Sequence, residues 1–175
     1  MCLIAIRMRK EDLQMIIAGV IGGEKKAETA KIISSIFGAK GNKVNIIDSS
    51  SLANLGCTKI RAYIKELEKN GTDLLILKAS VPDAEKGIFD GVEFDFVIYT
   101  DRTDVGPDSE VLTCSSGLGR VFSLMDEKGV AIVNVDDSDI IQMLTEMKYR
   151  FVTYGFNDKA SVTTSSIGDS VFTDG

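Results

Sequence analysis

The sequence of 175 residues contains no histidine, and its three cysteines lie far apart. Without histidine the chain lacks the commonest general base, and it cannot form the Ser–His or Cys–His pairs that activate many nucleophiles. Cys2, Cys57 and Cys114 are odd in number and form no C-x-x-C motif, which argues against a structural zinc site and a disulfide framework. The missing histidine is the most informative feature of the composition.

Long apolar runs and basic clusters are also missing. The longest apolar stretches have fewer than ten residues, too few to span a bilayer. The N-terminal stretch MCLIAIRMRKEDLQ places apolar residues before its charges, which is the reverse of a secretory signal. A net charge of −6 and a pI near 4.8 argue against a nucleic-acid partner. We therefore expect a cytoplasmic protein with neither a membrane nor a nucleic-acid partner.

The sequence has enough apolar material for one globular domain. It is 44% hydrophobic and 26% charged, and its length suits one core and is short for two. We expect a single domain over residues 1–175, with residues 1–14 as an N-terminal extension. Residues 160–175 are rich in Ser, Thr, Asp and Gly, and we expect a truncated or flexible tail there that either starts a small hairpin or is disordered.

Short apolar runs alternate with amphipathic stretches along the chain. Near-continuous apolar runs predict strands at residues 15–21, 43–47, 73–77, 94–99, 129–135 and 151–154. Helical spacing predicts helices at residues 24–37, 57–70, 118–128 and 138–147, with a short helix or turn at 83–89. This alternation indicates an α/β fold, in which helices cover both faces of a mostly parallel sheet of about six strands.

The first candidate site is the stretch GVIGGEKKAETA after the first predicted strand. Gly22 and Gly23 would allow a sharp turn into the helix, whose free N–H groups could bind an anion. Lys25 or Lys26 would add positive charge, as in loops that hold the phosphates of a nucleotide. Glu24, however, places a negative charge where a phosphate should lie. The pattern alone therefore favours an ordinary turn, with the acid serving the helix dipole.

Two further turns at the carboxyl ends of strands carry polar residues, where ligands of such sheets collect. Thr100 and Asp101 end the strand at 94–99, and the pattern favours loop acids that are simply solvated. Asn134, Asp136 and Asp137 end the strand at 129–135 and could bind a base or a ribose. Asp137 or the following Ser138 could equally cap the next helix, which the pattern favours.

Four stretches in order resemble the central ATP-binding domain of the Mur ligases, which join amino acids to UDP-N-acetylmuramoyl precursors of the bacterial cell wall. They are IIAGVIGGEKKAETAKIISSIFGAKGNKV, GIFDGVEFDFVIYTDRTDV, VAIVNVDDSD and RFVTYGFNDKASVTTSSI. The similarity extends over roughly residues 15–167, and the tripeptide-forming ligases are the most similar. The resemblance implies a three-layer P-loop NTPase-like domain. It also implies chemistry in which ATP and magnesium convert a carboxylate to an acyl phosphate that an amine attacks.

The resemblance implies a degenerate phosphate loop. The family's phosphate-binding lysine falls on Lys26, but the glycine before it has become Lys25. The threonine that holds magnesium has become Ala27, which has no hydroxyl. The family's metal-binding glutamate falls on Lys78, and the serine two places on is kept as Ser80. Several groups that would hold magnesium are therefore missing.

Other family positions fall further along the chain. The histidine that helps to hold a second metal would lie near Gly106, and the carbamoylated lysine near Leu118. The resemblance assigns the adenine side of the nucleotide site to three residues that are kept, Asn134, Asp136 and Asp137. It therefore implies that residues of the nucleotide site are kept, whereas several residues of the metal site are missing.

We expect a Mur-ligase-like domain related to peptidoglycan precursor ligases that is catalytically degenerate. It would bind ATP or another anion weakly through Gly22, Gly23, Lys25 and Lys26, or act through a protein partner or a second copy, and we do not expect magnesium to bind. The alternative is an active ATP-dependent amide ligase on UDP-N-acetylmuramoyl-peptide-like substrates, with a metal site rebuilt from Asp101, Asp104 or Asp108. Complete ligases of the family have two further domains, so the sequence is either a fragment or a single-domain relative.

Overall fold

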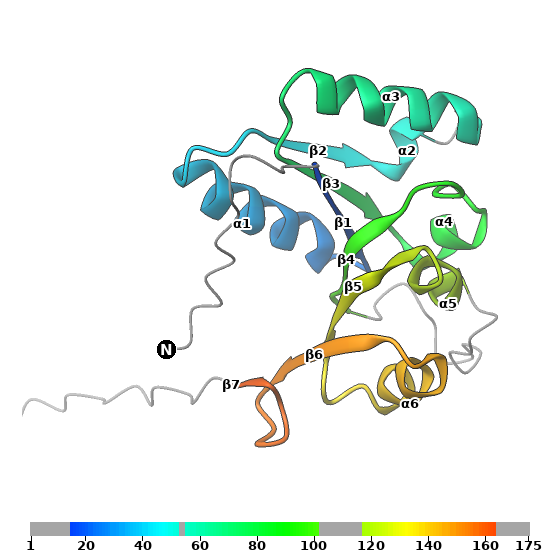
Figure 1. Ribbon diagram of the computed structural model, residues 1–175. Helices are drawn as coiled ribbons and strands as arrows, with labels where there is room; N and C mark the ends of the chain where they lie inside the picture. Colours follow the sequence, from blue (N-terminus) through cyan, green and yellow to red (C-terminus); the bar gives the residue numbers. More distant parts are fainter. Residues whose placement is uncertain (1–14, 53–54, 102–116, 164–175) are drawn as a thin grey trace, which may run out of the picture.

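The computed structural model describes residues 15–52, 55–101 and 117–163 of the chain. Its strands are β1 (Ile16–Ile21), β2 (Val44–Asp48), β3 (Leu74–Ala79), β4 (Phe94–Tyr99), β5 (Met125–Asn134), β6 (Arg150–Gly155) and β7 (Val162–Thr163). In this part of the chain the seven strands form one sheet in the order β2-β3-β1-β4-β5-β6-β7 (Figure 1). Every pair of neighbours is parallel, which confirms the predicted α/β class.

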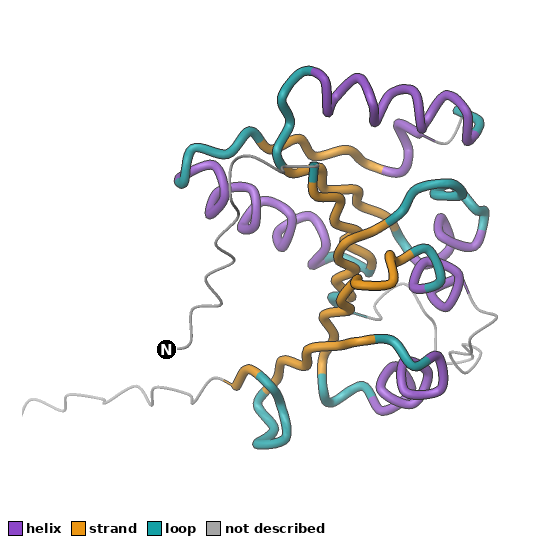
Figure 2. The backbone as a smooth tube through the Cα atoms, in the orientation of Figure 1, coloured by secondary structure: helices purple, strands orange, loops and turns teal. Residues whose placement is uncertain are grey.

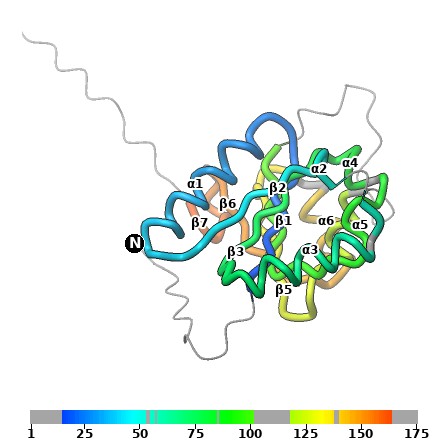
Figure 3. Tube along the Cα trace, turned by 90° about the horizontal axis from the view of Figure 1, so that it is seen from above, coloured from blue at the N-terminus to red at the C-terminus, as the bar shows by residue number. Residues whose placement is uncertain are grey.

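Helices connect strands β1 to β6 and alternate with them along the chain, whereas a loop joins β6 to β7 (Figure 2). They are α1 (Lys25–Ala39), α2 (Ser49–Leu52), α3 (Cys57–Lys69), α4 (Val81–Glu85), α5 (Gly117–Phe122) and α6 (Ser138–Met147). Figure 3 shows α1 and α3 on opposite sides of strands β2, β3 and β1, so the domain has three layers. Within the described ranges, no helix combines the length and the apolar character needed to cross a bilayer.

Two apolar cores lie on the two faces of the sheet because successive strand residues point to opposite faces. The larger core packs helices α3 to α6 against the sheet, and its rings include Phe89 and Phe94, which meet edge to face at 5.6 Å between centroids. The smaller core packs Ala30 of α1 against Val20 and Ile76. The near-continuous apolar strands are therefore buried from both sides, as the sequence predicted.

The start of β5 corrects one predicted element. Residues 118–128 were expected to be helical, but α5 ends at Phe122 and β5 begins at Met125. Met125 pairs with Phe94, and the Phe94 N–H donates to the Leu124 carbonyl at 2.8 Å. The register then shifts, because the residues before Gly129 form a bulge that β4 does not match. In the sequence, the charged residues of the bulge look like the polar face of a helix, which explains the wrong prediction.

The end of the described chain includes the first residues of the predicted tail. Residues 160–175 were expected to start a hairpin or to be disordered. Within this stretch the structure describes β7, which pairs in parallel with β6, with Tyr154 opposite Val162 and Gly155 opposite Thr163. Parallel pairing excludes a hairpin between these strands. Residues 164–175 lie outside the described part of the chain.

Replacing Phe94 with alanine should destabilise the domain strongly, because the ring is fully buried and contacts Phe89. We expect the free energy of unfolding to fall by about 3–5 kcal/mol. Urea denaturation followed by circular dichroism measures this change. Ile36→Ala is the control, since Ile36 on α1 is 52% exposed and its truncation should cost under about 1 kcal/mol. Equal losses in the two variants would contradict the assigned core.

Candidate functional site

The loop between β1 and α1 passes close to the end of β4. Gly22 has a φ of 150°, and a Cβ at this position would lie 2.2 Å from the Thr100 hydroxyl oxygen. Its N–H donates to the Ala79 carbonyl at 3.1 Å, and the Thr100 N–H donates to the Ile21 carbonyl at 2.9 Å. Both the backbone conformation and the space therefore require glycine at position 22.

The carboxylate of Asp101 binds the loop from the end of β4. The N–H of Gly23 donates to Asp101 Oδ1 at 2.9 Å, and the hydroxyl of Thr100 donates to the same oxygen at 2.7 Å. A backbone N–H at the start of a helix is the type of donor that binds phosphate. Here a side chain of the same chain accepts that hydrogen bond. The expectation that Asp101 is only a solvated loop acid is therefore wrong.

The two lysines of the loop are placed differently. Lys26 is half-buried, and its ammonium group donates to the Gly23 carbonyl at 2.7 Å. Lys25 is exposed at the first position of α1. Gly22, Gly23 and Lys26 therefore lie together in a loop whose lysine and Gly23 N–H group contact the protein itself. Binding of a ligand by these residues stays a prediction.

Lys78 lies at the position where the resemblance implies a metal-binding glutamate. It pairs with Asp48 on the neighbouring strand β2, with 3.2 Å between the ammonium nitrogen and the carboxylate oxygen. Burial raises the pKa of Asp48, but hydrogen bonds from Ser50 and the charge of Lys78 together hold that pKa below its ordinary value. Asp48 is thus ionised at neutral pH, and the amine of Lys78 offers no oxygen ligand to magnesium.

Ser80 serves the fold in this structure. It caps α4, where its hydroxyl oxygen accepts a hydrogen bond from the Asp83 N–H at 3.3 Å. Ser49 and Ser80 both donate to Asp83 Oδ2 at 2.9 Å, which joins α2 to α4. Burial raises the pKa of Asp83, but these two hydrogen bonds and the Lys86 ammonium hold it below its ordinary value.

The polar residues after β5 make local hydrogen bonds. Asp137 caps α6 by accepting from the Ile140 N–H at 3.2 Å, which confirms the capping interpretation. Asn134 Oδ1 accepts from the Asp136 N–H at 2.9 Å and closes a turn. These three residues lie at the same sheet edge as the loop after β1, with β4 between the two strands. Their assignment to the adenine side stays a prediction.

The side chain of Tyr154 reaches the end of β4 at this edge of the sheet. The sequence did not indicate this contact. The Tyr154 hydroxyl lies 3.2 Å from the carbonyl oxygens of both Tyr99 and Thr100, at the end of β4. Tyr154 belongs to β6, so its side chain reaches across β5. Burial, and to a lesser extent the charge of Asp101, raise the pKa of Tyr154. The phenol therefore stays neutral and keeps its donor at physiological pH.

Other implied metal positions offer no ligand or lie outside the described residues. Leu118, near the implied carbamoylated lysine, is fully buried in the larger core. Gly106, Asp104 and Asp108 fall in the undescribed range 102–116. Across the residues that the structure describes, no three His, Cys, Asp or Glu side chains gather closely enough to hold a metal ion.

This arrangement defines a class of protein: a three-layer α/β domain whose glycine loop, capped helices and Tyr154 all meet at the carboxyl edge of a parallel sheet. The chain belongs to the Mur ligase middle domain family, whose model matches residues 22–173. A solved structure of UDP-N-acetylmuramoyl-L-alanyl-D-glutamate–2,6-diaminopimelate ligase has the same fold, with a TM-score of 0.65 and 16% identity over 83% of this chain. The resemblance in the sequence is thereby confirmed.

Curated relatives carry ligase names. A chloroplastic MurE homologue of Arabidopsis thaliana, named as a UDP-N-acetylmuramoyl-L-alanyl-D-glutamate–2,6-diaminopimelate ligase, is 26% identical over 74% of this chain. A UDP-N-acetylmuramate–L-alanine ligase of Buchnera aphidicola is 25% identical over 91% of this chain. The matched regions cover 19% and 32% of these relatives and 33% of the solved structure. The chain is thus related to peptidoglycan precursor ligases and spans a third or less of their length.

Gly22→Ala should destabilise the domain by about 2–4 kcal/mol, because it adds both a clash with Thr100 and a strained φ. Thermal and urea denaturation measure the loss. Gly41→Ala separates the two causes, since Gly41 has a φ of 86° but no atom within 4 Å of its Cβ position, and should cost about 1–2 kcal/mol. Equal costs at both positions would show that the close approach to Thr100 is unimportant.

Asp83→Asn should lower stability by about 1 kcal/mol at pH 7, because it weakens the hydrogen bonds from Ser49 and Ser80. The folded chain lowers the pKa of Asp83, so the ionised group stabilises the fold above its ordinary value of 3.8, and this contribution is lost as the pH falls through the folded pKa. Urea denaturation at pH 7 and near pH 3 should therefore show the gap between wild type and variant closing. Exposed Asp158→Asn is the control, and a gap that persists at low pH would refute the assignment.

Proposed function

We propose that this chain is a Mur ligase middle domain whose phosphate loop is closed by its own side chains and which does not catalyse ATP-dependent ligation. One observation carries the proposal: the Gly23 N–H binds the Asp101 carboxylate, while the Gly23 carbonyl accepts from Lys26. Both backbone polar groups of Gly23 are thereby satisfied within the chain. A nucleotide would have to break these contacts before its phosphates could take their place.

The charge of Asp101 opposes that exchange. A phosphate beside the Gly23 N–H would lie close to a carboxylate, and two like charges about 4 Å apart repel by roughly 1–4 kcal/mol in a solvated or partly buried site. Lys25 and Lys26 offset part of this repulsion. Affinity for ATP should therefore be weak.

The losses at the metal positions support the same conclusion. Phosphoryl transfer requires cations that screen the oxygens meeting at the reacting phosphorus. Ala27 supplies no hydroxyl, and Lys78 is an ammonium group held by Asp48. With no histidine in the chain, three of the groups that the resemblance implies for catalysis are replaced. Loss of a single group of this kind can lower a rate by orders of magnitude.

A role without ligation remains for the domain. It would bind an anion weakly at the loop, or act as an interaction module towards a protein partner, a second copy or a UDP-sugar-peptide ligand. The relatives are named as ligases of UDP-N-acetylmuramoyl precursors, and the similarity of this chain to them supports a UDP-sugar-peptide ligand.

The second candidate is an active amide ligase, and the placement of Asp101 favours it. A carboxylate that reaches the phosphate loop is a typical oxygen ligand for magnesium, so Asp101 could hold the ion together with Asp104 and Asp108. In that case the contact with Gly23 would give way when MgATP binds.

Calorimetric titration with ATP, with and without magnesium, distinguishes the two candidates. We expect no magnesium-dependent binding by the wild-type chain at millimolar ATP. Asp101→Asn keeps an acceptor for Gly23 and removes the charge, so it should raise the affinity for inorganic triphosphate by about fivefold or more. Adding Lys26→Ala to that variant should remove the gain.

Opposite results would favour the active ligase. These are magnesium-dependent ATP binding by the wild type that Lys26→Ala abolishes, together with weaker binding in Asp101→Asn. Lys40→Ala is a matched control, because Lys40 is an exposed lysine at the other end of α1.

A further inference from the structure

A cavity of about 410 Å³ lies at the amino-terminal edge of the sheet, where β1, β4 and the bulge of β5 face α3. It is lined at its base by Met15 and Ile17, which begin β1. The phosphate loop follows the other end of the same strand, roughly 20 Å away for six residues at 3.3 Å each. The cavity is therefore separate from the candidate site at the carboxyl edge.

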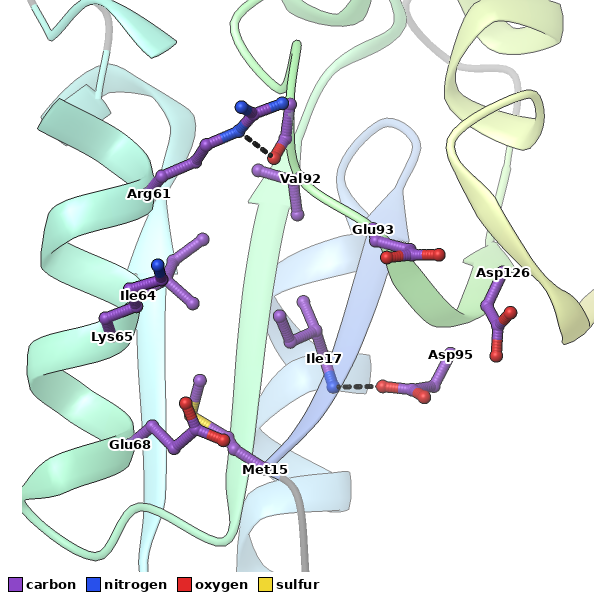
Figure 4. Close-up of a pocket in the computed structure, with 11 residues that line it drawn as sticks. Met15, Ile17, Arg61, Ile64, Lys65, Glu68, Val92, Glu93, Asp95 and Asp126 are labelled. Carbon is purple, nitrogen blue, oxygen red and sulfur yellow. Dashed lines mark hydrogen bonds between the residues drawn. The ribbon is translucent and has the colours of Figure 1, made fainter. Parts of the chain in front are cut away.

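One wall of the cavity is negatively charged. Figure 4 shows the side chains of Glu93, Asp95 and Asp126 gathered on one side of it. Asp95 accepts from the Ile17 N–H at 2.8 Å, whereas Glu93 and Asp126 have no hydrogen-bond or ion-pair partner among the described residues. Burial, and secondly the charge of Asp126, raise the pKa of Asp95. Negative charge on this wall is thus not neutralised by the described part of the protein.

The opposite wall, formed by α3, presents cations. Arg61 and Lys65 lie one turn apart on α3, on the other side of the cavity from the carboxylates (Figure 4). Arg61 Nε donates to the Gly91 carbonyl at 3.0 Å, and a Cβ on Gly91 would lie 2.7 Å from that nitrogen, so glycine makes room for a fixed guanidinium. Glu68 lies further along the helix, near Met15.

The floor between the charged walls is apolar. Ile17, Ile64 and Val92 line it, beside Met15. A bound molecule would therefore meet carboxylates on one side, cations on the other and methyl groups between them. Among the described residues no group of acids is suited to a metal ion, so an organic cation matches the acidic wall better than a metal does.

We propose that this cavity binds a small zwitterion, a molecule whose ammonium and carboxylate groups are joined by an apolar stem. The ammonium group donates to Asp95, Asp126 and Glu93, and the carboxylate accepts from Arg61 and Lys65. The stem packs on the apolar floor, where each buried methylene contributes about 0.8 kcal/mol. This site does not depend on the proposed function, because it shares no residue with the phosphate loop.

Titration of the full chain with 6-aminohexanoate, followed by heteronuclear NMR, tests the proposal. We expect saturable shifts at residues that line the cavity. Hexylamine lacks the carboxylate, hexanoate lacks the ammonium group and glycine lacks the stem, and each should bind about tenfold more weakly or worse. No saturable shift with 6-aminohexanoate at about 10 mM would overturn the site. Equal affinity for hexylamine would also overturn it, because the cationic wall would then contribute nothing.

Matched variants locate the binding. Asp126→Asn and Lys65→Gln should each weaken binding of 6-aminohexanoate by about tenfold. Glu127→Gln and Lys69→Gln change exposed neighbours that do not line the cavity and should leave the affinity unchanged. Lys26→Ala should also have no effect. Equal effects of the lining variants and their controls would overturn the proposal, since they would indicate a response to net charge.

Discussion

The arrangement of the carboxyl edge depends on the close approach of Gly22 to the end of β4. Because residue 22 has no side chain, Thr100 and Asp101 can reach the loop, and the Gly23 N–H then finds an acceptor within the protein. The same contact connects the ends of β1, β3 and β4 through backbone hydrogen bonds. A glycine turn, which is typical of a phosphate loop, here stabilises a loop whose Gly23 N–H binds the Asp101 carboxylate.

This domain has the scaffold of a Mur ligase middle domain but differs from the family pattern at the positions that the resemblance assigns to metal binding. The scaffold is kept, since the parallel sheet, the glycine turn and the capped helices are all present. At and near the positions that the resemblance assigns to metal binding, the residues present make contacts within the fold. Lys78 forms an ion pair, Ser80 caps a helix, and Leu118 is buried. These contacts within the chain contribute to the stability of the domain and involve no ligand.

Most of the fold could be predicted because the information is local. Apolar runs that are buried on both faces identified β1 and β3, and the position of Asp137 just before a predicted helix indicated a helix cap. The failures involve distant partners. Asp101 contacts Gly23 across 78 positions, and the start of β5 is set by pairing with β4, although its charged bulge favours a helix in isolation. A local sequence pattern does not indicate which strand ends lie next to each other in the fold.

The position of Tyr154 has an optical consequence. Its hydroxyl contacts the same peptide carbonyls that precede Asp101, so any ligand that displaces this carboxylate also disturbs the environment of the phenol. The sequence contains no tryptophan and only four tyrosines. Tyrosine emission is therefore not masked by indole fluorescence, and the emission of Tyr154 would respond to a ligand that displaces the Asp101 carboxylate.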